Sequence, residues 1–192
     1  MFKTQCFHVP LHRIEDFDEG SGTVGKRKEK GDSMAKGKTN AMRILDAAKI
    51  AYEMMSYDVK DGKIDGLSVA KKVGKNRLVV YKTLVAHGTS RNMYVFVIPV
   101  ENELDLKKAA TVVGEKKIEM IAVKDLQKLT GYIRGGCSPI GMSKKYPTFI
   151  QKEATHYEKI VVSGGKIGIQ IELPAASLAQ ITEATFANLV KR

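Results

Sequence analysis

The stretch NRLVVYKTLVAHG, residues 76–88, has the pattern of a β-strand with a lysine at its centre. Successive side chains of a strand point to opposite faces of the sheet. Both alternating sets in this stretch are largely apolar, as in a strand that is covered on both sides. Lys82 therefore points in the same direction as Val80 and Leu84, which we expect to be buried.

The lysine in this strand has two interpretations. A buried ammonium group is strongly destabilising unless another group pairs with it. In the first interpretation, the aliphatic stem of Lys82 follows the sheet and its charge reaches water near the end of the strand, as is common for lysine. In the second, the charge is held in place for a function, and support for that must come from the rest of the chain.

The composition is that of a soluble globular protein. The chain has 192 residues, of which 43% are hydrophobic and 28% are charged, which suits one domain with additional segments. No apolar run approaches the ~20 residues of a membrane span, and no secretory signal is evident, so we expect no membrane partner. The two cysteines, Cys6 and Cys137, lie in different contexts, which favours the reducing cytoplasm.

The positive charge is concentrated in one part of the chain. The formal net charge is +11, but residues 1–33 carry six basic and six acidic side chains, so the excess lies in residues 34–192. A basic domain of this kind predicts a polyanionic partner, with nucleic acid ahead of a membrane surface. A basic protein without such a partner would have the same charge.

Residues 1–36 differ in composition from the rest of the chain. Residues 18–33 contain almost nothing to bury, so we expect 1–36 to be a disordered or non-native extension and 37–192 to be the folded domain. The codons for residues 30–32 can resemble a ribosome-binding site just before the Met34 codon. We therefore expect translation to start at Met34, and a genuine charged tail is the alternative.

The remaining pattern interleaves helices and strands. Helices are predicted over residues 40–55, 65–74, 105–114, 123–131, 174–181 and 184–190. Strands are predicted over residues 56–60, 76–88, 93–98, 118–122, 158–162 and 167–173, with a turn at 163–166. A mixed sheet flanked by helices is the natural arrangement for such a pattern.

Two glycine-rich stretches are candidates for ligand binding, although neither matches a nucleotide-binding fingerprint. In residues 130–145, Gly135, Gly136 and Pro139 form a loop whose backbone could present N–H groups to an oxyanion or carbonyl. The alternative is a tight connection between elements. In residues 161–172, Ser163 could line the edge of a pocket, and the alternative is a hairpin turn.

Nucleophilic or metal-dependent catalysis has little support in the sequence. Cys137 lies in the first glycine-rich stretch, but no histidine is placed to activate it, and a buried structural cysteine is the simpler interpretation. His87 and His156 are isolated, no carboxylates are suggestively paired, and we expect no metal or cofactor. An enzyme built from these residues would act by positioning and electrostatics.

Basic residues occur in pairs, including Lys71-Lys72 and Lys144-Lys145. Solvated helix faces explain such pairs by default. Pairs that neighbour glycine-rich stretches would also suit the phosphates of an RNA acceptor end, so these four lysines are candidate phosphate contacts.

Several of these segments together resemble the YbaK/EbsC family. They are VYKTLV at 80–85, LDLKKAA at 104–110, KIEM at 117–120, TGYIRGGCSPIG at 130–141 and VSGGKIGIQIEL at 162–173. The resemblance covers residues 37–192. It implies an α/β protein of the α+β type, with a mixed, mostly antiparallel and barrel-like sheet flanked by helices. Members of the family are Cys-tRNA(Pro) deacylases, related to the editing domain of bacterial prolyl-tRNA synthetases.

The resemblance also implies roles for individual residues. Lys82 matches the family's essential lysine, whose charge helps to hold the aminoacylated adenosine, so the substrate would be its partner. The thiol of the bound cysteine, and no protein group, would attack the ester. The substrate-binding residues implied in the same way are Tyr57, Thr83, Gly135, Gly136, Pro139, Ser163 and Gln170.

The implied function is trans-editing of Cys-tRNA(Pro), extending to Cys-tRNA(Cys), with the tRNA acceptor end and prolyl-tRNA synthetase as partners. Three departures affect the expected selectivity: Asp65 replaces an aromatic residue, Cys137 an isoleucine and Gln170 an aspartate. A small pocket discriminates by only ~1–3 kcal/mol per methylene, so a deacylase for another small amino acid, such as Ala-tRNA(Pro), is one alternative. A non-catalytic tRNA-binding module of the same fold is the other.

Overall fold

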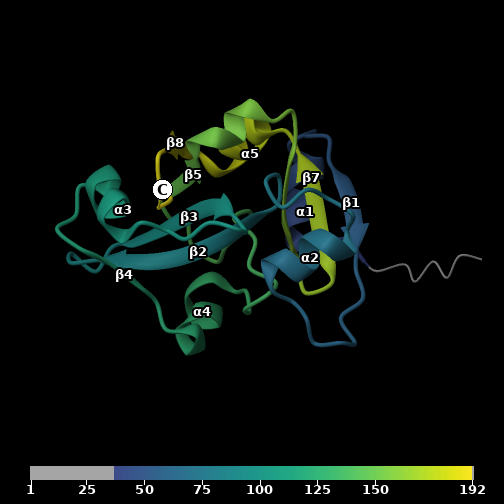
Figure 1. Ribbon diagram of the computed structural model, residues 1–192, viewed down its shortest axis with the longest axis horizontal. Coiled ribbons are helices and arrows are strands. Elements are labelled where there is room, and N and C mark those ends of the chain that lie inside the picture. Colours follow the sequence, from purple (N-terminus) through teal and green to yellow (C-terminus); the bar gives the residue numbers. More distant parts are fainter. Residues whose placement is uncertain (1–36, 192) are drawn as a thin grey trace, which may run out of the picture. The chain divides into compact units, whose positions relative to one another are not determined.

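The computed structural model describes residues 37–191, which form two β-sheets and five α-helices (Figure 1). The first sheet has the strand order β1-β7-β6, and the second has the order β4-β2-β3-β5-β8. The strands are β1 (Glu53–Ser56), β2 (Tyr81–Gly88), β3 (Met93–Pro99), β4 (Ile118–Met120), β5 (Thr148–Gln151), β6 (Ile160–Lys166), β7 (Ile169–Leu173) and β8 (Thr185–Ala187). The helices are α1 (Asn40–Ala47), α2 (Gly66–Lys72), α3 (Leu106–Val113), α4 (Val123–Thr130) and α5 (Ala175–Thr182), with a 3-10 turn η1 (Lys152–His156).

The predicted mixed, mostly antiparallel arrangement is confirmed. Four strand pairs are antiparallel, and β5 runs parallel to both β3 and β8. The barrel-like closure is wrong, because within residues 37–191 the two sheets are joined only by an isolated bridge between Val80 and Val161. The expectations for residues 1–36, including the start at Met34, lie outside the described residues. No helix of the described part is long and apolar enough to cross a membrane.

Four predicted elements differ from the structure. The first helix ends at Ala47, well before residue 55, and the strand predicted at 56–60 lies earlier, as β1. The predicted turn at 163–166 continues β6 as a β-bulge, and the turn itself is at residues 167–168, where Gly168 has φ +87°. The predicted helix at 184–190 contains β8, because Glu183 ends α5 in a left-handed conformation and the next residues pair with β5. Edge pairing outweighs a weak local helical preference there.

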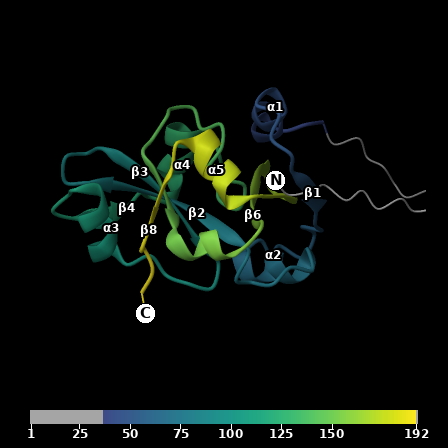
Figure 2. The ribbon, with the colours of Figure 1, turned by 90° about the horizontal axis from the view of Figure 1, so that it is seen from above.

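The hairpin of β2 and β3 is buried on both faces, as its sequence predicts. On one face, Val85 and Val97 pack into the core that includes Leu45 of α1 and Ile171 of β7. On the other face, Phe96 and Ile98 pack with Ala109 of α3 and with Leu189. Figures 1 and 2 show α1 and α2 beside the three-stranded sheet and α3 toward the other end of the hairpin.

One edge of β2 is only partly paired. The edge of β2 that faces β3 is paired over residues 81–87. On the opposite, partly paired edge, β4 pairs with residues 86–88, and Val80, just before the strand, forms the bridge to Val161. Residues 81–84 lie between these two contacts and have no strand partner on this edge within the described part of the chain.

Candidate active site

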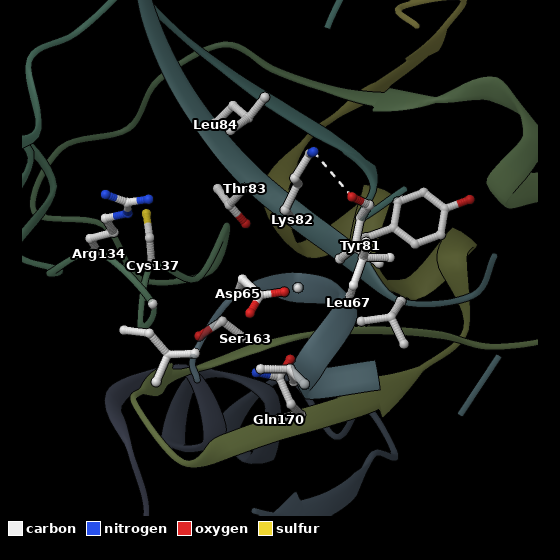
Figure 3. Close-up of a pocket in the computed structure, with 16 residues that line it drawn as sticks. Asp65, Leu67, Tyr81, Lys82, Thr83, Leu84, Arg134, Cys137, Ser163 and Gln170 are labelled. Carbon is white, nitrogen blue, oxygen red and sulfur yellow. Dashed lines mark hydrogen bonds between the residues drawn. The ribbon is translucent and has the colours of Figure 1, made fainter. Parts of the chain in front are cut away.

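A cavity of about 460 Å³ lies at the unpaired edge of β2 (Figure 3). Its wall is formed by the N-terminal end of α2, by β2 itself, by the loop that follows α4, and by the facing strands β6 and β7. Because the edge of β2 is open, residues from both faces of the strand reach the same cavity. Its lining includes Asp65, Lys82, Thr83, Gly135, Ser163 and Gln170.

Lys82 places a cation in the cavity wall. Its side chain is half-buried, and Nζ donates one hydrogen bond of 3.2 Å to the carbonyl oxygen of Val100 (Figure 3). Burial lowers the pKa of the Lys82 ammonium, while the charge of Glu103 opposes that shift. No carboxylate of residues 37–191 lies within ion-pair distance of Nζ. An ammonium has three donors, so two remain for a ligand.

Thr83, the next residue, contributes a hydroxyl group without a protein partner. Its Oγ1 is buried and makes no hydrogen bond to any described residue. Nearly all buried polar groups in proteins are hydrogen-bonded, and an orphaned one costs about 1–3 kcal/mol. Thr83 lines the cavity, so a small shift of the wall would let this hydroxyl bind a polar group of a ligand.

Hydrogen bonds within the loop after α4 fix its conformation. Tyr132 Oη donates to the carbonyl oxygen of Ile140 at 2.6 Å, and the backbone N–H of Ile140 donates to Ser138 Oγ. Gly135 lines the cavity with φ +83°, and a Cβ atom there would lie 2.7 Å from Cδ1 of Ile64. A side chain at this position would strain the backbone and force the Ile64 side chain to shift, which favours glycine.

The other two predicted residues of this loop lie outside the cavity lining. The backbone N–H of Gly136 donates to the carbonyl oxygen of Ile133 at 3.0 Å. Pro139 lines a smaller cavity, of about 180 Å³, together with Lys144 and Lys145. Within the glycine-rich segment, Gly135 therefore lines the cavity of about 460 Å³ and Pro139 lines the smaller one.

Strands β6 and β7 supply two polar side chains to the cavity. Ser163 and Gln170 are paired in register, so their side chains lie on the same face of the sheet. Ser163 Oγ accepts a hydrogen bond of 3.3 Å from the backbone N–H of Gly165, in the β-bulge. Gln170 is only 5% exposed.

The remaining predicted residues lie away from the cavity lining. Tyr57 is buried, and its ring centroid is 5.8 Å from Lys72 Nζ. The same Nζ donates to Asp61 Oδ1 and to the carbonyl oxygens of Asp58 and Lys63, so Lys72 clamps the loop before α2.

The other three candidate phosphate contacts are all exposed. Lys145 is paired with Glu183, whereas Lys71 and Lys144 have no ion-pair partner among residues 37–191. Among the four candidate lysines, Lys71 and Lys144 are therefore the two whose charge is not neutralised by a carboxylate of the described residues.

Among the lining residues that the sequence did not predict, Asp65, Arg134 and Cys137 bring a carboxylate, a guanidinium and a thiol to the cavity. Asp65 follows the pattern of a helix cap, and Arg134 directly precedes the chosen Gly135, so adjacency was the available signal. Burial raises the pKa of the Cys137 thiol to about 12, which leaves it protonated and a poor nucleophile at neutral pH. No histidine lines this cavity, and within residues 37–191 no three His, Cys, Asp or Glu side chains cluster as a metal site requires.

The site therefore offers a cation, an unpartnered hydroxyl and a glycine backbone around a cavity of small-molecule size, without a nucleophile–base pair. Such an arrangement can bind a polar ligand and stabilise negative charge that develops on it.

Comparisons with known proteins agree with this chemistry. Residues 67–181 match the family model described as the aminoacyl-tRNA editing domain. The chain is 44% identical over 155 residues to EbsC of Enterococcus faecalis, a protein named as a Cys-tRNA(Pro)/Cys-tRNA(Cys) deacylase, and the match covers 81% of this chain and 94% of that protein.

Solved structures show the same fold. A crystal structure described as a trans-editing enzyme for prolyl-tRNA synthetase superimposes with a TM-score of 0.67 at 23% identity, over 73% of this chain and 87% of that one. A crystal structure of a hypothetical protein gives 0.71 at 18% identity, over 78% of this chain and 97% of that one. The family match and the 44% identity together establish that the chain belongs to the aminoacyl-tRNA editing domain family.

Proposed function

We propose that this protein is a trans-acting deacylase that hydrolyses the ester between cysteine and the 3′ end of tRNA(Pro) and of tRNA(Cys). The observation that carries the proposal is the cavity itself: the Lys82 ammonium has free donors and lines the same cavity as the backbone of Gly135. Its volume of about 460 Å³ is in the range of small-ligand sites. The EbsC relative supports the choice of cysteine and of these two tRNAs.

The attacking group is proposed to be the thiol of the substrate. No histidine lines the cavity, and the pKa of the Cys137 thiol is too high for attack at neutral pH. The cysteinyl sulfur would form a bond to its own carbonyl carbon as the bond from that carbon to the ribose oxygen breaks. The thiol proton passes to the departing 3′ oxygen, and water then opens the thiolactone to release free cysteine.

Within this scheme, Lys82 and Gly135 stabilise charge and hold the substrate. The two unused donors of Lys82 face the aminoacyl ester or the adenosine to which it is attached. The backbone of Gly135 would lie beside the carbonyl oxygen, where negative charge develops during attack. Thr83, Ser163 and Gln170 complete the polar wall, whereas Tyr57, Gly136 and Pro139 would act through packing around it.

The proposed partner is the acceptor end of tRNA, with prolyl-tRNA synthetase as a second partner, in the cytoplasm. Residues 37–192 would carry the activity, because every residue that lines the cavity lies between 64 and 170. We assign phosphate contacts to Lys71 and Lys144, whose charges are not neutralised by a described carboxylate, ahead of Lys72 and Lys145.

The test is an ester-hydrolysis assay on tRNA(Pro) charged with cysteine, serine or alanine. We expect fast loss of cysteine and rates for serine and alanine close to those without protein, because neither side chain has a thiol. Equal rates for serine and cysteine would contradict the thiol mechanism, and faster alanine release would favour Ala-tRNA(Pro) as the substrate. Binding of tRNA without ester loss would favour a non-catalytic module.

A further inference from the structure

The charged groups of the cavity wall are unequal in number. Among the residues that line it, two are cationic, Lys82 and Arg134, and one is anionic, Asp65. Neither cation forms an ion pair with Asp65. In the view of Figure 3, Asp65 lies between Thr83 and Ser163, and Arg134 lies on the side of Cys137. The rim of the cavity thus carries an exposed carboxylate that forms no ion pair within the described part of the chain.

The backbone fixes the position of this carboxylate. Asp65 is the N-cap of α2, and its Oδ1 accepts a hydrogen bond of 3.0 Å from the backbone N–H of Ser68. The hydrogen bonds from Ser68 hold the pKa of the Asp65 carboxyl below its usual range, so it is ionised at neutral pH. Burial raises the pKa values of Tyr81 and Cys137 on the neighbouring walls, so these groups are neutral.

Gln170, on strand β7, adds another acceptor to the lining of the same cavity. The Gln170 side chain is 5% exposed and lines the cavity, and no hydrogen bond of its carboxamide to residues 37–191 is present. A buried polar side chain of this kind normally has a partner. Its carbonyl oxygen can accept a hydrogen bond from a ligand that enters the cavity.

We infer that Asp65, with the Gln170 carboxamide as a second acceptor, forms a subsite for the primary ammonium group of the esterified amino acid. The inference rests on the proposed function, since an aminoacyl ester carries one such cation. Lys82 and Arg134 repel an ammonium, which leaves Asp65 as the complementary group in this cavity. An acylated amine is neutral and bulkier, so esters with a blocked amino group, such as formylated or peptidyl forms, are excluded from the substrate class.

The experiment measures binding with a stable analogue in which an amide replaces the ester, 3′-cysteinylamino-3′-deoxyadenosine, and with its N-acetyl derivative. We expect the native protein to bind the free amine about tenfold or more tightly than the acetylated form, as for a charge-assisted hydrogen bond. Asp65→Asn should abolish most of this preference without unfolding the protein, because asparagine caps helices as well as aspartate does. Asp58→Asn is the matched control, since Asp58 lies in the preceding loop and outside the cavity lining.

Three results would overturn the subsite: equal affinities for the two analogues, an unchanged preference in Asp65→Asn, or no binding of either analogue. Hydrolysis of Cys-tRNA(Pro) is measured separately on the same samples. A native protein that prefers the free amine but leaves the ester intact would refute the proposed function and retain the subsite. A protein that cleaves the ester but binds both analogues equally would support the proposed function and refute the subsite.

Discussion

The two halves of strand β2 have a similar apolar alternation and different surroundings. Residues 86–88 pair with β4, and Ala86 and His87 also pair with β3 on the other edge. Val85 and Ala86 are fully buried. Residues 81–84 pair with β3 alone, and Lys82, Thr83 and Leu84 are half-buried around the cavity. The site thus arises where a strand loses a neighbour, because an open edge lets both faces of the strand contact one cavity.

Lys82→Ala, in the open half, is the strongest test of this comparison. We expect kcat/KM for Cys-tRNA(Pro) to fall about 100- to 1000-fold, as when a preorganised charge stabiliser is removed. Stability should change little, because Nζ has one hydrogen bond, to Val100. Lys124→Ala, an exposed site on α4, is the control, and normal turnover in Lys82→Ala would disprove the site.

Gly135→Ala tests the wall that faces the open half. Both Gly135 and Gly114 have positive φ, so alanine at either should cost about 1 kcal/mol of unfolding free energy. Only at Gly135 would the new Cβ meet another side chain, that of Ile64. Turnover should therefore fall at least about tenfold in Gly135→Ala and remain native in Gly114→Ala. Thermal unfolding and initial rates, measured on both variants, would separate the two effects, and equal rates would remove Gly135 from the site.

Thr83→Val separates a structural hydroxyl from one that binds substrate. Because Oγ1 has no protein partner, valine should leave the melting temperature unchanged or slightly higher. If the substrate is the missing partner, kcat/KM should fall about five- to tenfold. A lower melting temperature with native kinetics would mean that the hydroxyl is structural.

His87→Ala, in the closed half, should have the smallest effect. The His87 ring is half-exposed and lies 4.0 Å from Glu119, outside the cavity of about 460 Å³. We expect a stability change within about 0.5 kcal/mol and native deacylation. A large loss of activity would show that the functional part of β2 extends beyond its open half.

Local chemistry made much of the fold predictable from the sequence. Thr39, Asp65 and Asp105 accept hydrogen bonds from the first turns of α1, α2 and α3, and Gly114 and Gly131 end α3 and α4 in the left-handed conformation. The elements that could not be predicted depend on distant partners. Strand β8 exists because β5 offers an edge, and no local pattern in residues 184–190 indicates that edge.

Pattern and tertiary structure contribute differently to the site. The sequence by itself determined that Lys82 lies on an apolar strand and that Gly135 lies in a glycine-rich loop, because side-chain alternation and glycine content are local properties. It also determined the family, through motifs that are contiguous in the chain. Only the tertiary structure decided that Asp65 and Arg134 share the cavity with Lys82 while Pro139 does not. The physical reason is that a cavity forms between elements far apart in sequence, and its lining depends on where β4 and β6 leave β2 unpaired.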